Sequence, residues 1–367
     1  MKIPFFDYPR LFLDKKDEYM NIFSDVASRG AFIMQDDVDI FEKNLSIFSS
    51  SKYAIGVGNA TDGLEISWMA LNLRQGDEVI CCSHTMLATA SAIKVAGGIP
   101  IPVEIGDDNL IDPDAVEDAI TSRTVGIMPT QLNGRTCDME RIMQIANKYK
   151  LYVVEDAAQA LGSKFKGKNA GTFGNSSAIS FFPAKVLGCF GDAGAILCQD
   201  ETIFDRAYQL HDHGRDKNGD VKSWGRNSRL DNLQAAILNF NLKSYEKVIQ
   251  RRREIAFKYF SKLSILEELK LPESPVNNSD HYDVFQNYEI VAKRRDELQK
   301  YLKDCGVGTL VQWGGKAIHQ WKHLGFNLHL PKSEAFFKEC IMIPMNMFIS
   351  NEDIDYICQK IIEFYRK

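Results

Sequence analysis

The chain of 367 residues has no excess of positive charge and no long apolar run, and both absences limit its function. Its formal net charge is -5 at pH 7, so electrostatics give no reason to expect nucleic acid or an anionic membrane as a partner. No stretch approaches the roughly 18 apolar residues of a membrane span, and residues 1–10 lack the apolar core of a signal peptide. We therefore expect a cytoplasmic protein without membrane contact.

Metal-ligand spacing is also missing. The eight cysteines are scattered, and Cys81 and Cys82 lie inside an apolar run, where thiols behave as small hydrophobic side chains. The segment HDHG at 211–214 has no third ligand near it in sequence and is interpreted as a loop. No metal site is predicted.

A complete dinucleotide fingerprint is absent as well. Residues 56–61 read G-x-G-x-x-T, without the third Gly or Ala, and the run 78–82 does not end in an acid that would hold a ribose. An NAD-dependent dehydrogenase is therefore disfavoured. This region instead predicts a short strand at 53–57, followed by a Gly turn and the start of a helix. Thr61 or Asp62 could cap that helix. Unpaired N–H groups at such a helix N-terminus suit a phosphate.

Short apolar runs alternate with helix-length segments through the first two-thirds of the chain. The runs are 53–57, 78–82, 99–104, 125–129, 151–154, 178–182 and 194–198. This order predicts an α/β fold with a mostly parallel sheet between helices, and ligands beyond the carboxyl ends of its strands.

A long helical pattern from about residue 230 leads to a smaller α+β C-terminal part. Strands are expected at 284–291, 307–312 and 340–343, a surface loop at 266–280, and a closing helix that starts at Ser350 with Asp353 three residues on. We expect a large domain at 1–240 and a small one at 241–367.

The stretch 151–198 carries the chemistry. An apolar run ends in Glu155 and Asp156, and Lys185 follows the next run in a Gly-rich turn. This combination suits pyridoxal 5'-phosphate (PLP), whose aldehyde forms a Schiff base with a lysine and whose ring nitrogen is kept protonated by a carboxylate. Taken alone, the two residues fit a solvated loop lysine and a helix cap better; the surrounding motifs reverse that preference.

Four motifs together resemble one family. They are EDAAQ at 155–159, SFFPAKVLG with GDAG behind it at 180–194, GNATDGL at 58–64, and NSRLDNLQAA at 227–236. The chain resembles the DegT-like PLP-dependent nucleotide-sugar aminotransferases, which have fold type I of the aspartate aminotransferase superfamily. The resemblance covers nearly the whole chain.

This resemblance implies roles for residues around the cofactor ring. Lys185 would hold the cofactor and move the proton during transfer, and Asp156, twenty-nine residues earlier, would pair with the ring nitrogen. Gln159 would lie near the ring oxygen; an exposed helix amide is the alternative. His84 would stack on the ring, although histidine is also common in loops.

The resemblance also implies a phosphate site and a shared active site. Ala60, Thr61 and Ser180 would hold the phosphate, although Ser180 could instead bond to a neighbouring backbone carbonyl. Asn227 would reach the phosphate bound by the neighbouring subunit, which makes a homodimer obligatory. The alternative for Asn227 is a helix N-cap.

Substrate contacts are expected from three further residues. Arg229 would clamp the carboxylate of the amino donor, or form a structural ion pair. Trp313 and His319 lie in the segment VQWGGKAIHQ, which departs from the family pattern and would contact the sugar or nucleotide. Trp313 fits equally well as a buried anchor.

The expected function is transfer of an amino group from L-glutamate to a nucleotide-linked 3-keto-6-deoxyhexose. The carrier would be dTDP and the product an amino sugar for lipopolysaccharide O-antigen, an S-layer or another surface glycan. A 4-keto substrate is the alternative within the family. A non-catalytic regulator with the same fold is the alternative of another class, although retention of Lys185 favours transamination.

Overall fold

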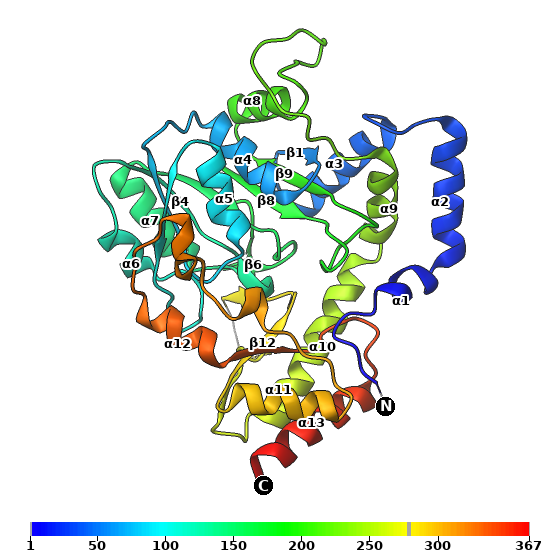
Figure 1. Ribbon diagram of the computed structural model, residues 1–367. Coiled ribbons are helices and arrows are strands. Elements are labelled where there is room, and N and C mark those ends of the chain that lie inside the picture. Colours follow the sequence, from blue (N-terminus) through cyan, green and yellow to red (C-terminus); the bar gives the residue numbers. More distant parts are fainter. Residues whose placement is uncertain (1, 277–279, 367) are drawn as a thin grey trace.

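A seven-stranded sheet forms the centre of the computed structural model, which describes residues 2–276 and 280–366 (Figure 1). Its strands, in spatial order, are β1 (Tyr53–Val57), β9 (Gly194–Cys198), β8 (Ser176–Ser180), β5 (Tyr152–Asp156), β4 (Thr124–Met128), β2 (Glu78–Cys82) and β3 (Ile99–Val103). In this sheet β9 runs antiparallel to both of its neighbours, and the other pairings from β8 to β3 are parallel. The predicted α/β fold with a mostly parallel sheet is confirmed.

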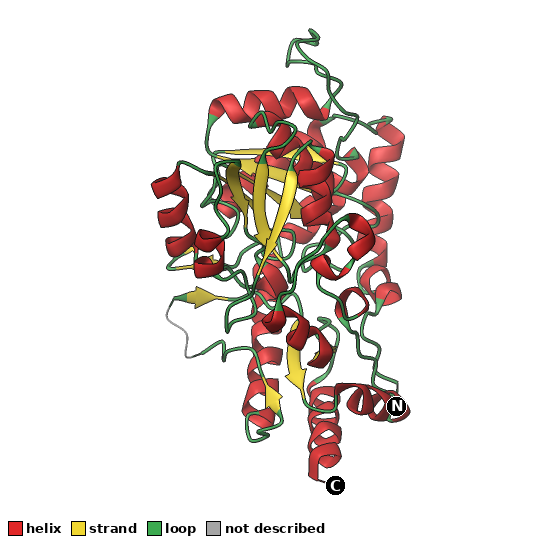
Figure 2. Ribbon diagram, turned by 60° about the vertical axis from the view of Figure 1, so that its left-hand side comes forward, coloured by secondary structure: helices red, strands yellow, loops and turns green. Residues whose placement is uncertain are grey.

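Helices cover both faces of the sheet because successive strand residues point to opposite sides (Figure 2). Ile196 packs with α4, α5 and α8, whereas its neighbours Ala195 and Leu197 pack with α3 and α9. The helices of this part are α1 (Tyr8–Leu13), α2 (Lys16–Arg29), α3 (Asp36–Ser49), α4 (Ala60–Ala70), α5 (Leu87–Val95), α6 (Pro113–Asp118), α7 (Met139–Tyr149), α8 (Glu201–His211) and α9 (Asn232–Leu242).

The C-terminal part builds a second core around α10 (Tyr245–Leu263). Buried Ile255 and Tyr259 of this helix pack against a three-stranded sheet, and Ile3 from the N-terminus joins the same cluster. That sheet orders β10 (Leu269–Lys270), β12 (Tyr288–Ala292) and β13 (Cys340–Ile343), with α11 (Arg295–Asp304), α12 (Pro331–Glu339) and α13 (Asn351–Arg366) around it. A small third sheet, β11 (His281–Tyr282) with β6 (Lys164–Phe165) and β7 (Lys168–Asn169), connects the two parts.

Several sequence predictions need correction in this region. The expected strand at 307–312 makes only isolated bridges, from Val307 to Ile3 and from Leu310 to Met342. The expected strand at 284–291 starts later, at Tyr288, because φ is 51° at Phe285 and breaks the extended backbone. The long helical pattern is two helices, α9 and α10.

Two further expectations concern the cap of the closing helix and the loop 266–280. Ser350 and Asp353 do cap α13 reciprocally: the Asp353 N–H donates to Ser350 Oγ at 3.0 Å, and the Ser350 N–H donates to Asp353 Oδ2 at 3.1 Å. Residues 277–279 of the expected loop 266–280 lie outside the described residues.

Candidate active site

The end of strand β5 separates two neighbouring carboxylates onto opposite faces of the sheet. Asp156 faces the side of α5, where Thr89 Oγ1 donates to its Oδ2 at 2.6 Å. The Ala158 N–H donates to Asp156 Oδ1 at 3.2 Å. Only 4% of Asp156 is exposed, so it is a buried acid held in one orientation by two donors.

Glu155 has a structural task on the other face. Its oxygens accept from the N–H groups of Gly171, Phe173 and Gly174 at 2.8, 2.6 and 2.9 Å, and from Gln131 Nε2 at 2.7 Å. The buried carboxylate therefore organises the loop that leads into β8. Of the two acids, Asp156 is the one available to a ligand.

Lys185 lies in a tight turn that follows β8. The Lys185 N–H donates to the Phe182 carbonyl oxygen at 2.8 Å, and the Cys189 N–H donates to the Phe181 carbonyl oxygen at 2.9 Å. A Cβ on Gly188 would lie 3.0 Å from the carbonyl oxygens of Phe182 and Pro183, so the turn closes there because the residue is glycine.

The side chains of Lys185 and Asp156 interact electrostatically. Burial lowers the pKa of Lys185 to about 8, and the Asp156 carboxylate partly opposes this shift. Burial raises the pKa of Asp156, and the Thr89 hydroxyl, the Ala158 N–H and Lys185 oppose that shift. The site thus holds an amine that loses its proton easily beside an acid that lacks a full counter-charge.

The start of α4 presents backbone N–H groups of the kind that bind a phosphate. As the first residues of the helix, Ala60 and Thr61 have N–H groups without an intrahelical acceptor. Ser180 pairs in register with Gly194, and a Cβ on Gly194 would lie 2.6 Å from Ala60 N. Strand β9 therefore passes close to the helix start, and Ser180, whose Oγ accepts from the Phe182 N–H at 3.3 Å, lies on the neighbouring strand β8.

The cap of α4 differs from the expected Thr61 or Asp62. Asn59 is the N-cap, and its Oδ1 accepts from the Asp62 N–H at 2.9 Å. The Asp62 carboxylate instead accepts from Ser228 Oγ at 2.7 Å, and the same hydroxyl accepts from the Gly58 N–H at 3.0 Å. Ser228, which the sequence interpretation missed, holds the Gly turn to the segment before α9.

Gln159 takes part in a polar network rather than facing solvent. Its Oε1 accepts from the Asn133 N–H at 2.9 Å and lies 3.5 Å from Asn287 Nδ2. Asn133 Nδ2 donates to Glu289 Oε2 at 2.6 Å, and its Oδ1 accepts from Asn287 Nδ2 at 2.8 Å. The alternative of an exposed helix amide does not fit these contacts.

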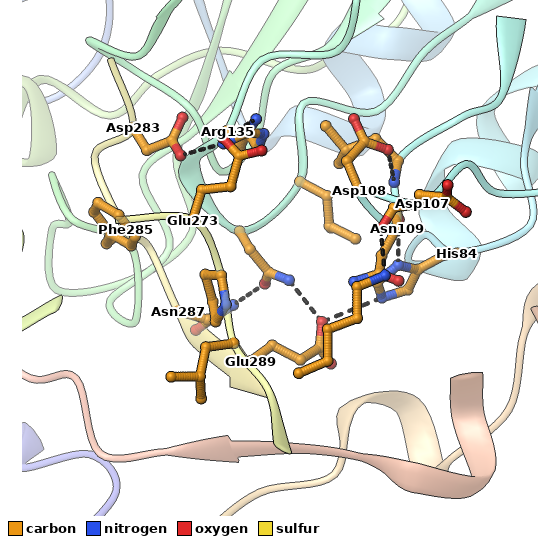
Figure 3. A pocket seen from close by; sticks show the side chains of 16 residues that line it. His84, Asp107, Asp108, Asn109, Arg135, Glu273, Asp283, Phe285, Asn287 and Glu289 are labelled. Carbon is orange, nitrogen blue, oxygen red and sulfur yellow. Dashed lines mark hydrogen bonds and ion pairs between the residues drawn. The ribbon is translucent and has the colours of Figure 1, made fainter. Parts of the chain in front are cut away.

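A cavity of about 320 Å³ lies beside this network, between the two parts of the chain (Figure 3). Its lining includes five carboxylates and two cations: Asp107, Asp108, Glu273, Asp283, Glu289, Arg135 and Lys270. Arg135 donates to Asp283 Oδ2 at 2.8 Å and to Glu273 Oε2 at 2.9 Å, so its charge is already neutralised. The excess of carboxylates makes this cavity unsuited to a diphosphate or a dicarboxylate.

His84 lies at the wall of that cavity. Its Nδ1 bonds to the Asn109 carbonyl oxygen at 2.8 Å, and its Nε2 lies 3.4 Å from Glu289 Oε2. The ring centroid is 4.4 Å from that of Phe336, and 1% of the residue is exposed. The predicted stacking of His84 on the cofactor ring is not supported, because the imidazole is already enclosed.

Asn227 and Arg229 belong to the stretch between α8 and α9, whose loop projects beyond α8 (Figure 1). Asn227 is exposed and pairs through its backbone with Asp212; it does not cap α9, whose N-cap is Asp231. Arg229 Nη1 lies 3.1 Å from Asp212 Oδ1. This ion pair favours the structural alternative for Arg229 over a carboxylate clamp.

Trp313 packs at the junction of the two parts, and His319 pairs with α12. The indole of Trp313 is half-buried, with its ring centroid 5.8 Å from that of His84. His319 Nε2 lies 3.2 Å from Glu334 Oε1 of α12, and 1% of His319 is exposed. These contacts fit the anchor alternative for Trp313 and place His319 out of reach of a sugar.

These groups fit PLP, which supplies an aldehyde and an electron-withdrawing ring when it is bound. The cofactor phosphate matches the N–H groups of Ala60 and Thr61 with the Ser180 hydroxyl. The ring nitrogen matches Asp156, whose desolvated charge a pyridinium would compensate. Thr89, sixty-seven residues from Asp156 in sequence, donates a hydrogen bond that orients this carboxylate.

The described residues offer no comparable support for a metal ion or a membrane span. Within residues 2–276 and 280–366, no group of three or more His, Cys, Asp or Glu side chains is arranged to hold a metal ion. Every helix in the same residues is too short or too polar to cross a bilayer.

The lowered pKa of Lys185 predicts a distinct reactivity in the apo-protein. The amine should be mostly unprotonated above about pH 8, whereas a lysine in a peptide titrates near 10.4. We expect labelling of Lys185 by an amine-selective reagent, followed by mass spectrometry, to rise with a midpoint near pH 8. A midpoint near pH 10 would contradict the burial of this amine.

Comparison with known proteins shows the family of this chain. Residues 13–362 match the DegT/DnrJ/EryC1/StrS aminotransferase family. A "Pleiotropic regulatory protein" of Geobacillus stearothermophilus is 37% identical, over 100% of this chain and 99% of that protein. The "dTDP-3-amino-3,6-dideoxy-alpha-D-galactopyranose transaminase" of Aneurinibacillus thermoaerophilus is 36% identical over 98% of both chains.

Another relative names a different nucleotide. The "UDP-2-acetamido-2-deoxy-3-oxo-D-glucuronate aminotransferase" of Pseudomonas aeruginosa is 35% identical, over 91% of this chain and 92% of that protein. The relatives therefore differ in the nucleotide and in the sugar.

Solved structures show the same fold. DesV of S. venezuelae matches with a TM-score of 0.95 and 30% identity, over 100% of this chain and 99% of that one. NtdA of Bacillus subtilis "with bound cofactor pmp" matches with a TM-score of 0.91 and 33% identity, over 100% of this chain and 86% of that one. The chain belongs to the DegT/DnrJ/EryC1/StrS family and is a PLP-dependent sugar aminotransferase of fold type I.

Proposed function

We propose that this enzyme transfers the amino group of L-glutamate to the keto group of a dTDP-linked 3-keto-6-deoxyhexose. The observation that carries the chemistry is Lys185 in its closed turn, in electrostatic contact with buried Asp156. The relative from Aneurinibacillus thermoaerophilus, named for a dTDP-3-amino sugar, supports the sugar class. A 4-keto hexose and another nucleotide remain the alternatives within the family.

Each residue of this chain would then act at a stated atom. Lys185 Nζ would take a proton from the carbon that carries the donor nitrogen and return it on the cofactor side. Asp156 would keep the ring nitrogen protonated, and Thr89 keeps the carboxylate oriented. Ala60, Thr61 and Ser180 would bind the phosphate, and Gln159, fixed by the Asn133 N–H, would interact with the ring oxygen.

The sugar proposal is tested by absorbance and then by a substrate screen. Purified protein supplemented with PLP should show a visible band that L-glutamate removes and a 3-keto-6-deoxyhexose nucleotide restores. Restoration by a 4-keto sugar instead would move the proposal to that branch. A band that neither donor nor sugar changes would overturn the proposed reaction.

A homodimer with shared sites is the second element of this proposal. The segment 212–227 projects from the body, and Trp224 in it is 96% exposed (Figure 1). Trp224 belongs to this projecting segment, and an indole so exposed suits insertion into a second copy. Asn227, the last residue of the segment, would then reach the partner's cofactor phosphate.

The shared site predicts complementation between two variants. Lys185→Ala and Asn227→Ala each damage a different half of the same site, so a mixed dimer has one intact site and one with both lesions. Co-refolded equal amounts should recover up to about a quarter of wild-type activity, because about half of the dimers are mixed and one site works in each. Activity no higher than the mean of the two parents would contradict a shared site.

The regulator alternative has one specific observation in its favour, the 37% identity to a protein named as a pleiotropic regulator. The two readings separate in the absorbance test, because a non-catalytic protein would give no glutamate-dependent change. Retention of Lys185 and Asp156 in one site favours the enzyme.

We further propose a cytoplasmic location and products for surface glycans such as lipopolysaccharide O-antigen or an S-layer. Eight cysteines without a disulfide suit a reducing compartment. A division into domains near residue 240 is likewise proposed; the separate C-terminal core around α10 supports it.

A further inference from the structure

The side chain of Gln286 bonds to the backbone on both sides of Lys185. Gln286 Nε2 donates to the Ala184 carbonyl oxygen at 2.8 Å, and Gln286 Oε1 accepts from the Val186 N–H at 2.9 Å. The amide thus bonds to the residues immediately before and after Lys185. Only 6% of Gln286 is exposed, so water cannot readily replace either bond.

Gln286 is itself fixed by the C-terminal part. Arg252 of α10 is buried, and its Nη1 donates to the carbonyl oxygens of Phe285 and Gln286 at 3.0 and 3.1 Å. A Cβ on Gly134 would lie 2.6 Å from the nitrogens of both residues. The amide is therefore located by α10 on one side and by the turn after β4 on the other.

The next residue makes a matching contact across the site. Asn287 Nδ2 donates to Asn133 Oδ1 at 2.8 Å, and Asn133 N–H bonds to Gln159. Two consecutive side chains at the entry to β12 thus reach the Lys185 turn and the Gln159 network.

We propose that Gln286 is a positioning residue, which fixes the direction of the Lys185 amine and couples α10 and β12 to it. This inference rests on the proposed role of Lys185 as the amine that binds PLP. An amide suits the task because it offers one donor and one acceptor; a hydrocarbon offers neither. Without them, Ala184 C=O and Val186 N–H lose these partners, and the turn relaxes toward solvent.

The test compares three variants of the full chain. Gln286→Leu removes both bonds, and Gln286→His retains one donor and one acceptor at a different spacing. Gln250→Leu is the matched control, since Gln250 is an exposed amide of α10 that donates to Tyr282 Oη at 2.9 Å. Two quantities are measured: the pH midpoint of Lys185 labelling in the apo-protein and the dissociation rate of PLP.

Gln286→Leu should raise the labelling midpoint by about one pH unit, equivalent to tenfold less free amine at neutral pH. PLP should dissociate about tenfold faster, Gln286→His should fall between it and wild type, and Gln250→Leu should match wild type. If Gln286→Leu does not fold, the same two quantities in Gln286→His, compared with wild type, test the positioning role.

An unchanged midpoint and dissociation rate, with only a lower melting temperature, would overturn the positioning role. A wild-type protein that binds no PLP would instead overturn the proposed function, and the labelling midpoint would still test Gln286.

Discussion

Replacing Lys185 by alanine is expected to lower the transamination rate by about 10⁴-fold or more. The substitution removes both the amine that binds the cofactor aldehyde and the base that moves the proton. The half-reaction with L-glutamate, followed by absorbance in a single turnover, measures this loss without interference from product release. PLP should still bind without a covalent bond, because the N–H groups of Ala60 and Thr61 are untouched.

Two controls make this result specific. Lys185→Arg keeps a positive charge near Asp156 but cannot condense with an aldehyde, so it should be as inactive as the alanine variant. Lys303→Ala removes an exposed lysine of α11 and should leave the rate unchanged. Transamination retained within tenfold in Lys185→Ala would remove the lysine from the mechanism.

Asp156→Asn is expected to lower the rate by about 10²–10³-fold while the fold persists. A neutral amide cannot keep the proton on the ring nitrogen, so the ring withdraws electrons weakly. The apo-protein should be no less stable than wild type, because burial raises the pKa of Asp156 and its charge is poorly compensated. The transamination rate and the thermal unfolding of the apo-protein, both measured for Asp156→Asn and wild type, check the two expected effects.

The adjacent acid supplies the matched control. Glu155→Gln should cost about 2–3 kcal/mol of unfolding free energy, because three backbone N–H groups and Gln131 donate to that carboxylate. Its effect on the glutamate half-reaction should be small once the protein is folded. If Asp156→Asn instead destabilised the fold and spared the rate, Asp156 would have the structural task.

Much of the fold follows from local patterns. The runs at 53–57, 78–82 and 194–198 are strands with those bounds, because short, mostly apolar segments suit a sheet that helices cover on both faces. Predictions failed where contacts with distant residues set the backbone, as at Phe285 and in 307–312. Propensity says little about such positions.

The candidate site divides in the same way. Motifs around Asp156, Lys185 and Ala60 indicate an acid, an amine and a helix N-terminus, since each is a local feature of strand, turn or cap. His84 shows the limit of this approach: its ring is enclosed by Phe336 and the C-terminal part, which are distant from it in sequence. The sequence contained no signal for that contact.

The sequence by itself determined the α/β class, the Gly-closed turn after the lysine and the acid at the strand end. Those features depend on residues within a few positions of one another. Only the tertiary structure decided which side chains hold these features in place. Thr89 bonds to Asp156, sixty-seven residues away in sequence, and Gln286 bonds to Val186, one hundred residues away. Such pairings have no local signature, because packing of the sheet against α5 and α10 brings their atoms together.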